Sequence, residues 1–230
     1  MADNQDRGWT RRSMITGTAV AAGMALAGEP GLAAAPPQCK TVKTYSNADF
    51  YDAQGKFQVE KARAAYYEMF RRFDYAISPR IEKEMWILDF ALGDFAHVGM
   101  AGILWLNRQD YGYFGHEIFL LPGQMIPEHS HVATDKGPAK MESWQPRHGM
   151  IYTFGEGEAT PELMAHVPES QRGLIKSTHC KALQVDEMAD LNRRTAWHFM
   201  VGGPAGALVT EYGTYHDVAG LRFSNPKAKF

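Results

Sequence analysis

Cysteine is scarce in this chain, since only two occur among 230 residues. Two thiols cannot build a disulfide scaffold or a four-cysteine zinc site, so stability must come from packing and any bound metal from other ligands. Cys39 and Cys180 do not form a C-x-x-C pair, and the sequence leaves open whether they form a disulfide in an oxidising compartment.

An excess of either charge is also missing, because 24 basic and 26 acidic side chains give a formal net charge of -2. Without a surplus of positive charge to follow a phosphate backbone, nucleic acid is not an expected partner. The sequence also lacks an internal repeat, a phosphate-binding glycine loop and a G-x-S-x-G motif. In contrast, 45% of the residues are hydrophobic and 12% are aromatic, which excludes a disordered chain and provides one folded core.

The first 35 residues have the layout of a twin-arginine export signal. Arg11 and Arg12 precede an uncharged stretch over residues 16–27, and the small residues 33–35 before two prolines suit cleavage. The stretch is too short and too rich in Gly and Ala to cross about 30 Å of hydrocarbon, which takes roughly 20 residues. We therefore predict a chain without a permanent membrane span, which the twin-arginine export machinery delivers to the periplasm or outside the cell.

Residues 36–85 are predicted to form a helical extension. Apolar residues recur at helical spacing from Phe57 to Phe73, and Ser78-Pro79 ends the pattern. Residues 46–49 offer an N-terminal cap. We expect a helix of about 20 residues that ends near Asp74 and that Gly55 interrupts.

From Trp86 onward, short apolar or alternating runs are separated by Gly, Pro, Asn and Asp. This pattern is typical of a compact all-β domain, a jelly roll or a small barrel, and not of a nucleotide-binding α/β sheet. We predict one mainly β barrel domain over residues 86–230, with residues 155–172 as a long loop. The clearest strand candidates are residues 100–106, 115–121, 149–154 and 207–212.

A histidine pair followed by a carboxylate has the pattern of a metal site. Residues two apart in a strand project from the same face, so His129 and His131 can close on one ion. Glu142 follows a loop with Gly137-Pro138 that lets the chain turn back, and His198 on a later strand offers a fourth ligand. Three imidazoles and one carboxylate leave coordination positions open on a divalent ion such as Mn, Fe or Zn. The other histidines lack such spacing and are expected to be solvated or packed: His97, His116, His148, His166, His179 and His216.

In these stretches the chain resembles the cupins, and among them the smaller type of D-lyxose isomerase. The resemblance covers about residues 87–226, and its strongest blocks are residues 117–124, 127–131 and 140–144. It implies a double-stranded β-helix and an aldose–ketose interconversion through a metal-stabilised enediol. The implied sugars are D-lyxose with D-xylulose and D-mannose with D-fructose. The metal ligands that it implies are His129, His131, Glu142 and His198, with Mn as the metal and Fe, Zn or Co as alternatives.

Several positions depart from the pattern of that family. Met141 stands where a second carboxylate is usual, and Pro146 interrupts the strand that follows Glu142. Residues 190–194 replace the usual Pro-Gly turn before the last histidine, and residues 220–222 replace acidic residues. These departures bear on the identity of the sugar more than on the fold or the metal.

Two side chains are predicted to move protons. Glu211 lies on an expected strand whose alternation can aim it into the barrel, and it matches a glutamate of the resembled family. A carboxylate there can take a proton from one sugar carbon and return it to the next. Lys140 shares a face with Glu142 and is expected to hold or protonate a substrate oxygen. The sequence leaves open that both are surface residues.

Substrate-binding residues follow from the same stretches. Arg222 is expected to bind sugar hydroxyls or a sugar acid. Aromatic side chains are expected to form an apolar wall against the sugar ring, although such residues on inward strand positions are often plain core. These are Trp144, Trp197 and Phe223.

Two other functions remain open from the sequence alone. A cupin oxygenase would need a redox-active metal such as Fe and would not depend on Glu211. A non-catalytic periplasmic protein that binds sugar or metal would keep the four ligands without turnover. A homodimer through sheet edges, with the N-terminal helix over one edge, is left open as well.

Overall fold

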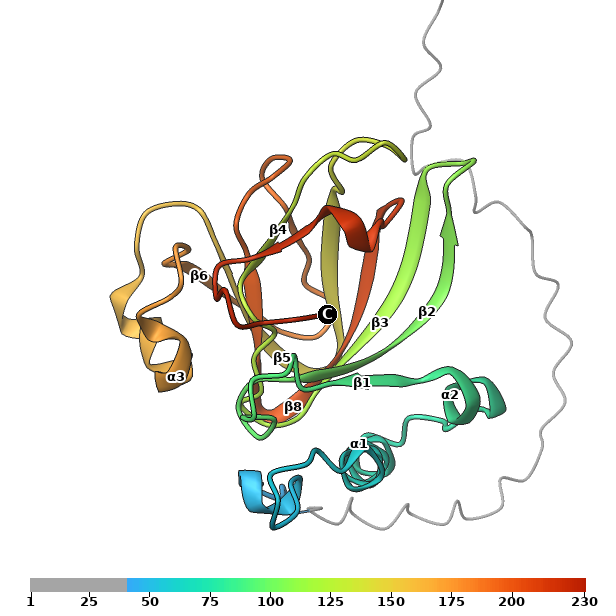
Figure 1. Ribbon diagram of the computed structural model, residues 1–230, viewed down its shortest axis with the longest axis vertical. Helices are drawn as coiled ribbons and strands as arrows, with labels where there is room; N and C mark the ends of the chain where they lie inside the picture. Colours follow the sequence, from blue (N-terminus) through green and yellow to red (C-terminus); the bar gives the residue numbers. More distant parts are fainter. Residues whose placement is uncertain (1–40) are drawn as a thin grey trace, which may run out of the picture. The chain divides into compact units, whose positions relative to one another are not determined.

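The computed structural model describes residues 41–230 (Figure 1). The predicted export signal over residues 1–35 and Cys39 lie outside the described residues. Cys180, which the sequence offered as a partner for Cys39, is buried.

Three helical segments open the described chain: the 3-10 helix η1 (Asn47–Asp49), α1 (Val59–Arg72) and α2 (Pro79–Glu84). One face of α1 buries Ala62, Tyr66 and Phe70 in a core that includes strand residues such as Phe119. Figure 1 shows α1 and α2 at the bottom of the view, beside the barrel.

The predicted N-terminal helix is shorter than expected. It has 14 residues and ends at Arg72, two positions before Asp74. The chain turns before the helix because the carboxylate of Asp52 accepts the backbone N–H groups of Gln54 and Lys56. Such a bond offers the backbone an alternative to the helix, which therefore begins only after Gln58.

Antiparallel strands make up the rest of the fold, and the prediction of a mainly β barrel is confirmed. A seven-stranded sheet has the order β1-β2-β3-β8-β5-β6, with β7 on β5, and β4 pairs with β9 in a second sheet. The four clearest strand candidates lie in β2, β3, β5 and β8, except that Leu121 follows the end of β3. The strands are β1 (Trp86–Leu88), β2 (Met100–Arg108), β3 (Tyr113–Leu120), β4 (His129–His131), β5 (Glu142–Gly155), β6 (His179–Leu183), β7 (Ala189–Asp190), β8 (Phe199–Thr214) and β9 (Leu221–Phe223).

Strand β5 continues through Pro146, so the prediction that this proline interrupts the strand is wrong. Pro146 pairs with Val209 of β8, and the register shifts between Pro146 and His148. Proline has no N–H to donate to a ladder, and it is tolerated at such a bulge. The bulge keeps both halves of β5 in the barrel.

Residues 155–172, which the sequence predicted to be a long loop, are partly helical. They contain the 3-10 helix η2 (Pro161–His166) and the short helix α3 (Glu169–Arg172). Leu163 and Val167 pack against a small core with Phe154 and Phe199.

The turn after β3 leads the chain toward β4, the strand that carries His129 and His131. Gly123 has a φ of 71°, a left-handed conformation that glycine adopts without steric cost. The chain then passes through the barrel interior, where Ile126 is bonded by its N–H to the carbonyl of Met200, before β4 begins.

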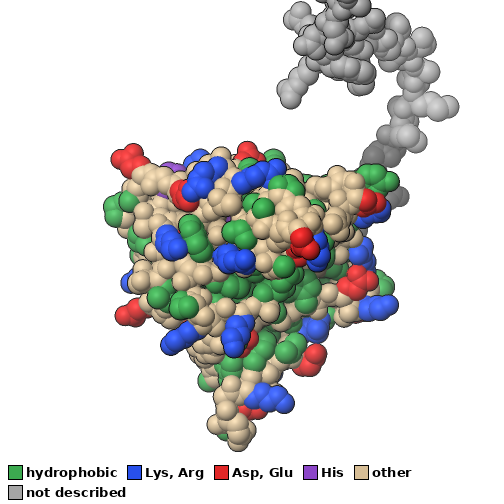
Figure 2. All heavy atoms as spheres, turned by 45° about the horizontal axis from the view of Figure 1, so that its top comes forward, with side chains coloured by type: hydrophobic (Ala, Val, Ile, Leu, Met, Phe, Trp, Pro, Cys, Tyr) green, Lys and Arg blue, Asp and Glu red, His purple; other side chains and the backbone are tan. Residues whose placement is uncertain are grey.

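The surface carries mixed charge. Figure 2 shows Lys and Arg side chains interspersed with Asp and Glu on the visible face, with apolar side chains between them. Within residues 41–230, no helix is both long enough and apolar enough to cross a membrane.

Candidate metal centre and its cavity

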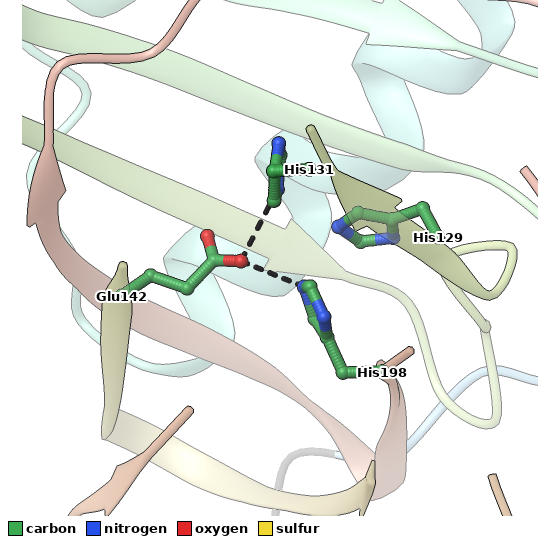
Figure 3. Close-up of side chains that lie close together, drawn as sticks. All are labelled: His129, His131, Glu142 and His198. Carbon is green, nitrogen blue, oxygen red and sulfur yellow. Dashed lines mark ion pairs between the residues drawn. The ribbon is translucent and has the colours of Figure 1, made fainter. Parts of the chain in front are cut away.

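Four side chains from three segments converge inside the barrel (Figure 3). His129 and His131 come from β4, Glu142 begins β5, and His198 directly precedes β8. One donor atom of each lies within 4.8 Å of the others. The Oε1 atom of Glu142 is 2.7 Å from Nε2 of His198 and 3.2 Å from Nε2 of His131.

Backbone pairing brings these segments together. His129 and His198 form an antiparallel bridge, in which each N–H donates to the carbonyl of the other at 3.0 and 2.9 Å. The strand period of two then puts the rings of His129 and His131 on one side, 5.3 Å apart. The residues that the sequence singled out as ligands therefore meet at one place.

The imidazoles are oriented for metal binding. The Nδ1–H of His129 donates to the carbonyl of Pro127 at 2.9 Å, and that of His198 donates to the carbonyl of Ala196 at 3.0 Å. A ring held in this way keeps Nε2 as a lone pair directed at the ion.

Several inward atoms of this group lack a hydrogen-bond partner. They are Nε2 of His131, Nε2 of His198 and Oε1 of Glu142, all buried. Because the proton of His198 is on Nδ1, its Nε2 and the carboxylate oxygen at 2.7 Å are both acceptors and form no hydrogen bond. Leaving such an atom unpaired costs about 1–3 kcal/mol, and a coordinated cation removes that penalty. The nitrogen and oxygen donors suit a divalent transition metal, so this group could hold a metal ion.

Electrostatics favour the ligand forms of two of these side chains. Burial, together with the nearby His198 and His131, holds the pKa of His129 well below its usual value, so its imidazole is neutral. Burial alone would raise the pKa of Glu142. The ammonium of Lys140, with His131 and His198 acting in the same direction, outweighs burial and holds that pKa well below its usual value.

A second carboxylate is linked to this group through a lysine. The Nζ atom of Lys140 is 2.6 Å from Oε2 of Glu142 and also pairs with Oε1 of Glu211. Glu211 on β8 accepts a hydrogen bond from Nδ1 of His116 on β3 at 2.8 Å. Burial opposes the charge of Lys140, but the two carboxylates prevail and raise its pKa. These four buried side chains therefore contact one another in a row, in the order His116, Glu211, Lys140, Glu142.

These groups open into a cavity of about 300 Å³ in the barrel. Its wall is aromatic and aliphatic beyond the ionisable residues. Trp144 and Phe223, two of the predicted wall residues, line it, and the ring of Trp144 lies 5.3 Å from that of His198.

Arg222 and Trp197 do not line the cavity, which corrects their predicted role. The guanidinium of Arg222 is exposed and donates to the carbonyls of Ala219 and Leu221. The ring of Trp197 lies against the ammonium of Lys176 at 3.8 Å. Their immediate neighbours along the chain face inward, and side chains of successive residues in extended backbone point to opposite faces.

His116 and His216 line the same cavity and were missed as functional residues. The signal for His116 was its place two residues from Phe114 and Ile118, on the inward side of β3. His216 follows the end of β8, where no alternation applies, and its ring lies 5.5 Å from that of His131. Burial, reinforced by Lys140 and His131, lowers the pKa of His216 to about 3, so it is neutral at pH 7.

Curated relatives of this chain are sugar isomerases. The D-lyxose/D-mannose isomerase of Thermosediminibacter oceani is 28% identical over 174 residues, which cover 76% of this chain and 94% of that protein. The D-lyxose ketol-isomerase of Cohnella laeviribosi is 31% identical over 170 residues, covering 74% of this chain and 91% of that protein. A search with protein-family models gave no match.

Solved structures with a similar fold are L-ribose isomerases. That of Cellulomonas parahominis without ligand has a TM-score of 0.57 at 16% identity and covers 78% of this chain and 95% of its own. The enzyme of Acinetobacter sp. DL28 in complex with L-ribose has a TM-score of 0.58 at 17% identity, with 80% and 96% covered. At this identity the similarity establishes the barrel fold.

Proposed function

Because this chain belongs to the D-lyxose ketol-isomerase family, we propose that it interconverts D-lyxose and D-xylulose with one divalent metal ion. D-mannose and D-fructose are the proposed second pair, since a relative of this chain is named for both aldoses. Manganese is the proposed ion, because imidazole and carboxylate donors with open positions suit it. Fe, Zn and Co are the alternatives.

One observation carries this proposal. The four-residue ligand group and a separate buried carboxylate, Glu211, face the same cavity and are joined by Lys140. A protein that only binds metal has no use for the second carboxylate. An oxygenase would not need a base at that position either.

The reaction moves hydrogen without net loss of any atom. The proton on C2 of the aldose goes to C1, and the hydroxyl proton on O2 goes to O1, through an enediol. A bound divalent ion supplies a Lewis acid that stabilises the negative charge developing on O1 and O2.

The side chains of this protein supply the proton transfer. Glu211 is the proposed base that takes the proton from C2 and returns it to C1. Lys140 and the Nδ1–H of His116 bind its two oxygens, which fixes the direction of the carboxylate. Lys140, charged because of its two carboxylate neighbours, is the proposed donor of a hydrogen bond to a substrate oxygen.

A screen of aldoses and ketoses in D2O tests this function. The chain is loaded in turn with Mn, Fe, Zn and Co, and NMR follows deuterium entering the C1 and C2 positions together with ketose formation. Turnover of D-lyxose with at least one metal is the expected result. Tight metal binding without deuterium exchange on any sugar would show instead that the chain is a non-catalytic protein that binds metal or sugar.

We also propose that the chain is exported by the twin-arginine route, on the support of Arg11, Arg12 and the uncharged stretch over residues 16–27. In a bacterial host, the chain should be recovered from the periplasmic fraction. The Arg11→Lys, Arg12→Lys double variant should stay in the cytoplasm, and equal periplasmic recovery of both forms would contradict this route.

A further inference from the structure

The cavity wall has few uncommitted hydrogen-bonding side chains for a polyhydroxylated ligand. From the chemistry of this wall, we infer that the enzyme prefers aldoses whose end remote from the carbonyl is deoxygenated. The inference rests on the proposed isomerase function and specifies the substrate class that the same site accepts.

The polar side chains of the cavity are already committed. His129, His131, Glu142 and His198 form the ligand group, and His116, Lys140 and Glu211 form the buried chain beside it. The remaining polar groups of the lining are His216, whose Nδ1 is buried without a partner, and the indole N–H donors of Trp86 and Trp144. Among residues 41–230, no Ser, Thr, Asn, Gln, Asp or Arg lines this cavity.

An arc of aromatic rings adjoins the polar groups. Phe223 lies 6.3 Å from His129 and 5.8 Å from Phe90, measured between ring centroids. On the other side, Trp86 stacks on His116 at 5.3 Å and lies 6.0 Å from Phe230. We call these four residues, Trp86, Phe90, Phe223 and Phe230, the aromatic arc. A substrate with its carbonyl end at the ligand group meets the arc with its remote end.

The sign of the expected preference follows from this composition. The indole N–H of Trp86 is the one side-chain donor of the arc. A hydroxyl group buried against Phe90, Phe223 and Phe230 therefore loses its hydrogen bonds to water without a side-chain replacement, whereas a methyl group there gains from burial. A hydrophobic pocket disfavours an added hydroxyl by up to about 10²-fold, but a pocket built to bond that hydroxyl rejects the deoxy analogue by about 10⁴-fold or more. The two kinds of wall therefore predict opposite effects of one substitution in the sugar.

Three aldoses test the inference on the metal-loaded full chain: D-mannose, 6-deoxy-D-mannose and D-lyxose. The first two differ only in the hydroxyl on C6, and D-lyxose lacks C6 altogether. We expect kcat/KM for 6-deoxy-D-mannose to exceed that for D-mannose by on the order of 10-fold or more. We also expect kcat/KM for 6-deoxy-D-mannose to exceed kcat/KM for D-lyxose. If the preference came only from less crowding in the cavity, D-lyxose, the smallest of the three sugars, would be the best substrate.

The outcomes separate the inference from the function on which it rests. If D-lyxose is turned over but kcat/KM for D-mannose equals or exceeds that for 6-deoxy-D-mannose, the inference is overturned and the isomerase function stands. If D-lyxose is the best substrate of the three, the size of the sugar decides the preference, and the inference is overturned as well. No turnover of any sugar with any metal overturns both.

A matched pair of variants checks that the arc is the cause. Phe223→Met and Phe223→Gln place side chains of similar length at one position, and only Gln can bond a hydroxyl. The preference for 6-deoxy-D-mannose should persist in Phe223→Met and fall by about 10-fold in Phe223→Gln. Equal preference in two variants with the same melting temperature would contradict a role of the arc.

Discussion

Nδ1 of His116 lies 2.8 Å from Oε2 of Glu211, between two residues that face each other directly across strands β3 and β8. The ring of His116 is clamped, because Trp86 stacks on it at 5.3 Å and 17°. Gly102 permits this packing, since a Cβ atom there would lie 2.4 Å from Nε2 of His116. A rigid donor therefore holds the proposed catalytic base.

His116 should act as a positioning residue for that base. His116→Phe keeps an aromatic ring under Trp86 but removes the donor, and we expect kcat to fall by about 10- to 100-fold with little change in KM. His116→Asn, which can still donate a hydrogen bond, should recover part of the loss. Metal content serves as the control and should match that of the parent chain in both variants. A parallel rise in KM, or equal losses in both variants, would indicate a purely structural role.

Replacing Glu211 by Gln should remove the proton transfer and keep the metal. We expect a loss of about 10² or more in kcat, as is usual for removal of a general base. Deuterium exchange at C2, followed by NMR, should fall with it. Full activity in this variant would remove Glu211 from the mechanism.

The ligand group could be predicted from the sequence because its spacing obeys the strand period. His129 and His131 are two residues apart, so any extended conformation puts them on one side. Glu142 was inferred from the loop before it and His198 from a later strand, and the resemblance implied the same two residues. The fold brings them to the pair through pairing that only tertiary structure sets, namely the bridge between His129 and His198.

The neighbours of the site were harder to predict for a physical reason. Arg222 and Phe223 are consecutive, as are Trp197 and His198, and alternation allows only one of each pair to face inward. The sequence does not fix which one, and a shift by one residue exchanges the faces. His116 had only the alternation along β3 to mark it, and His216 becomes recognisable only once β8 is placed beside the cavity.

Metal should stabilise the fold as well as the reaction. The unpartnered atoms of His131, His198 and Glu142 find a partner in the ion, and a ligand at 100 times its Kd stabilises the folded state by about 2.7 kcal/mol. For a chain of this size each kcal/mol raises Tm by roughly 2–4 °C. We expect Tm of the chelator-treated chain to rise by several degrees on addition of Mn, measured by calorimetry.

The same experiment on a ligand variant provides the control. His131→Ala removes one donor of the group, so its Tm should respond much less to Mn at the same concentration. An equal shift in the variant and the parent chain would place the stabilising ion somewhere else.

Cys180 should be unreactive in the folded protein. Burial, with a smaller contribution from the charge of Glu162, raises the pKa of its thiol from 9.0 to about 12. The thiolate is the nucleophile, so alkylation at pH 8 should follow unfolding. Cys39→Ser leaves one thiol in the chain, and its labelling by iodoacetamide can be compared with and without urea.

The same shift has a consequence for stability at high pH. A group whose pKa is higher in the folded than in the unfolded state contributes stability below the unfolded value and loses it above. The free energy of unfolding should therefore fall as pH rises from about 9 towards 12. Cys180→Ala, measured by urea denaturation beside Cys39→Ser, should lose less stability over this range. Identical pH dependence in the two variants, or rapid labelling of the native protein, would show that Cys180 ionises freely in the fold.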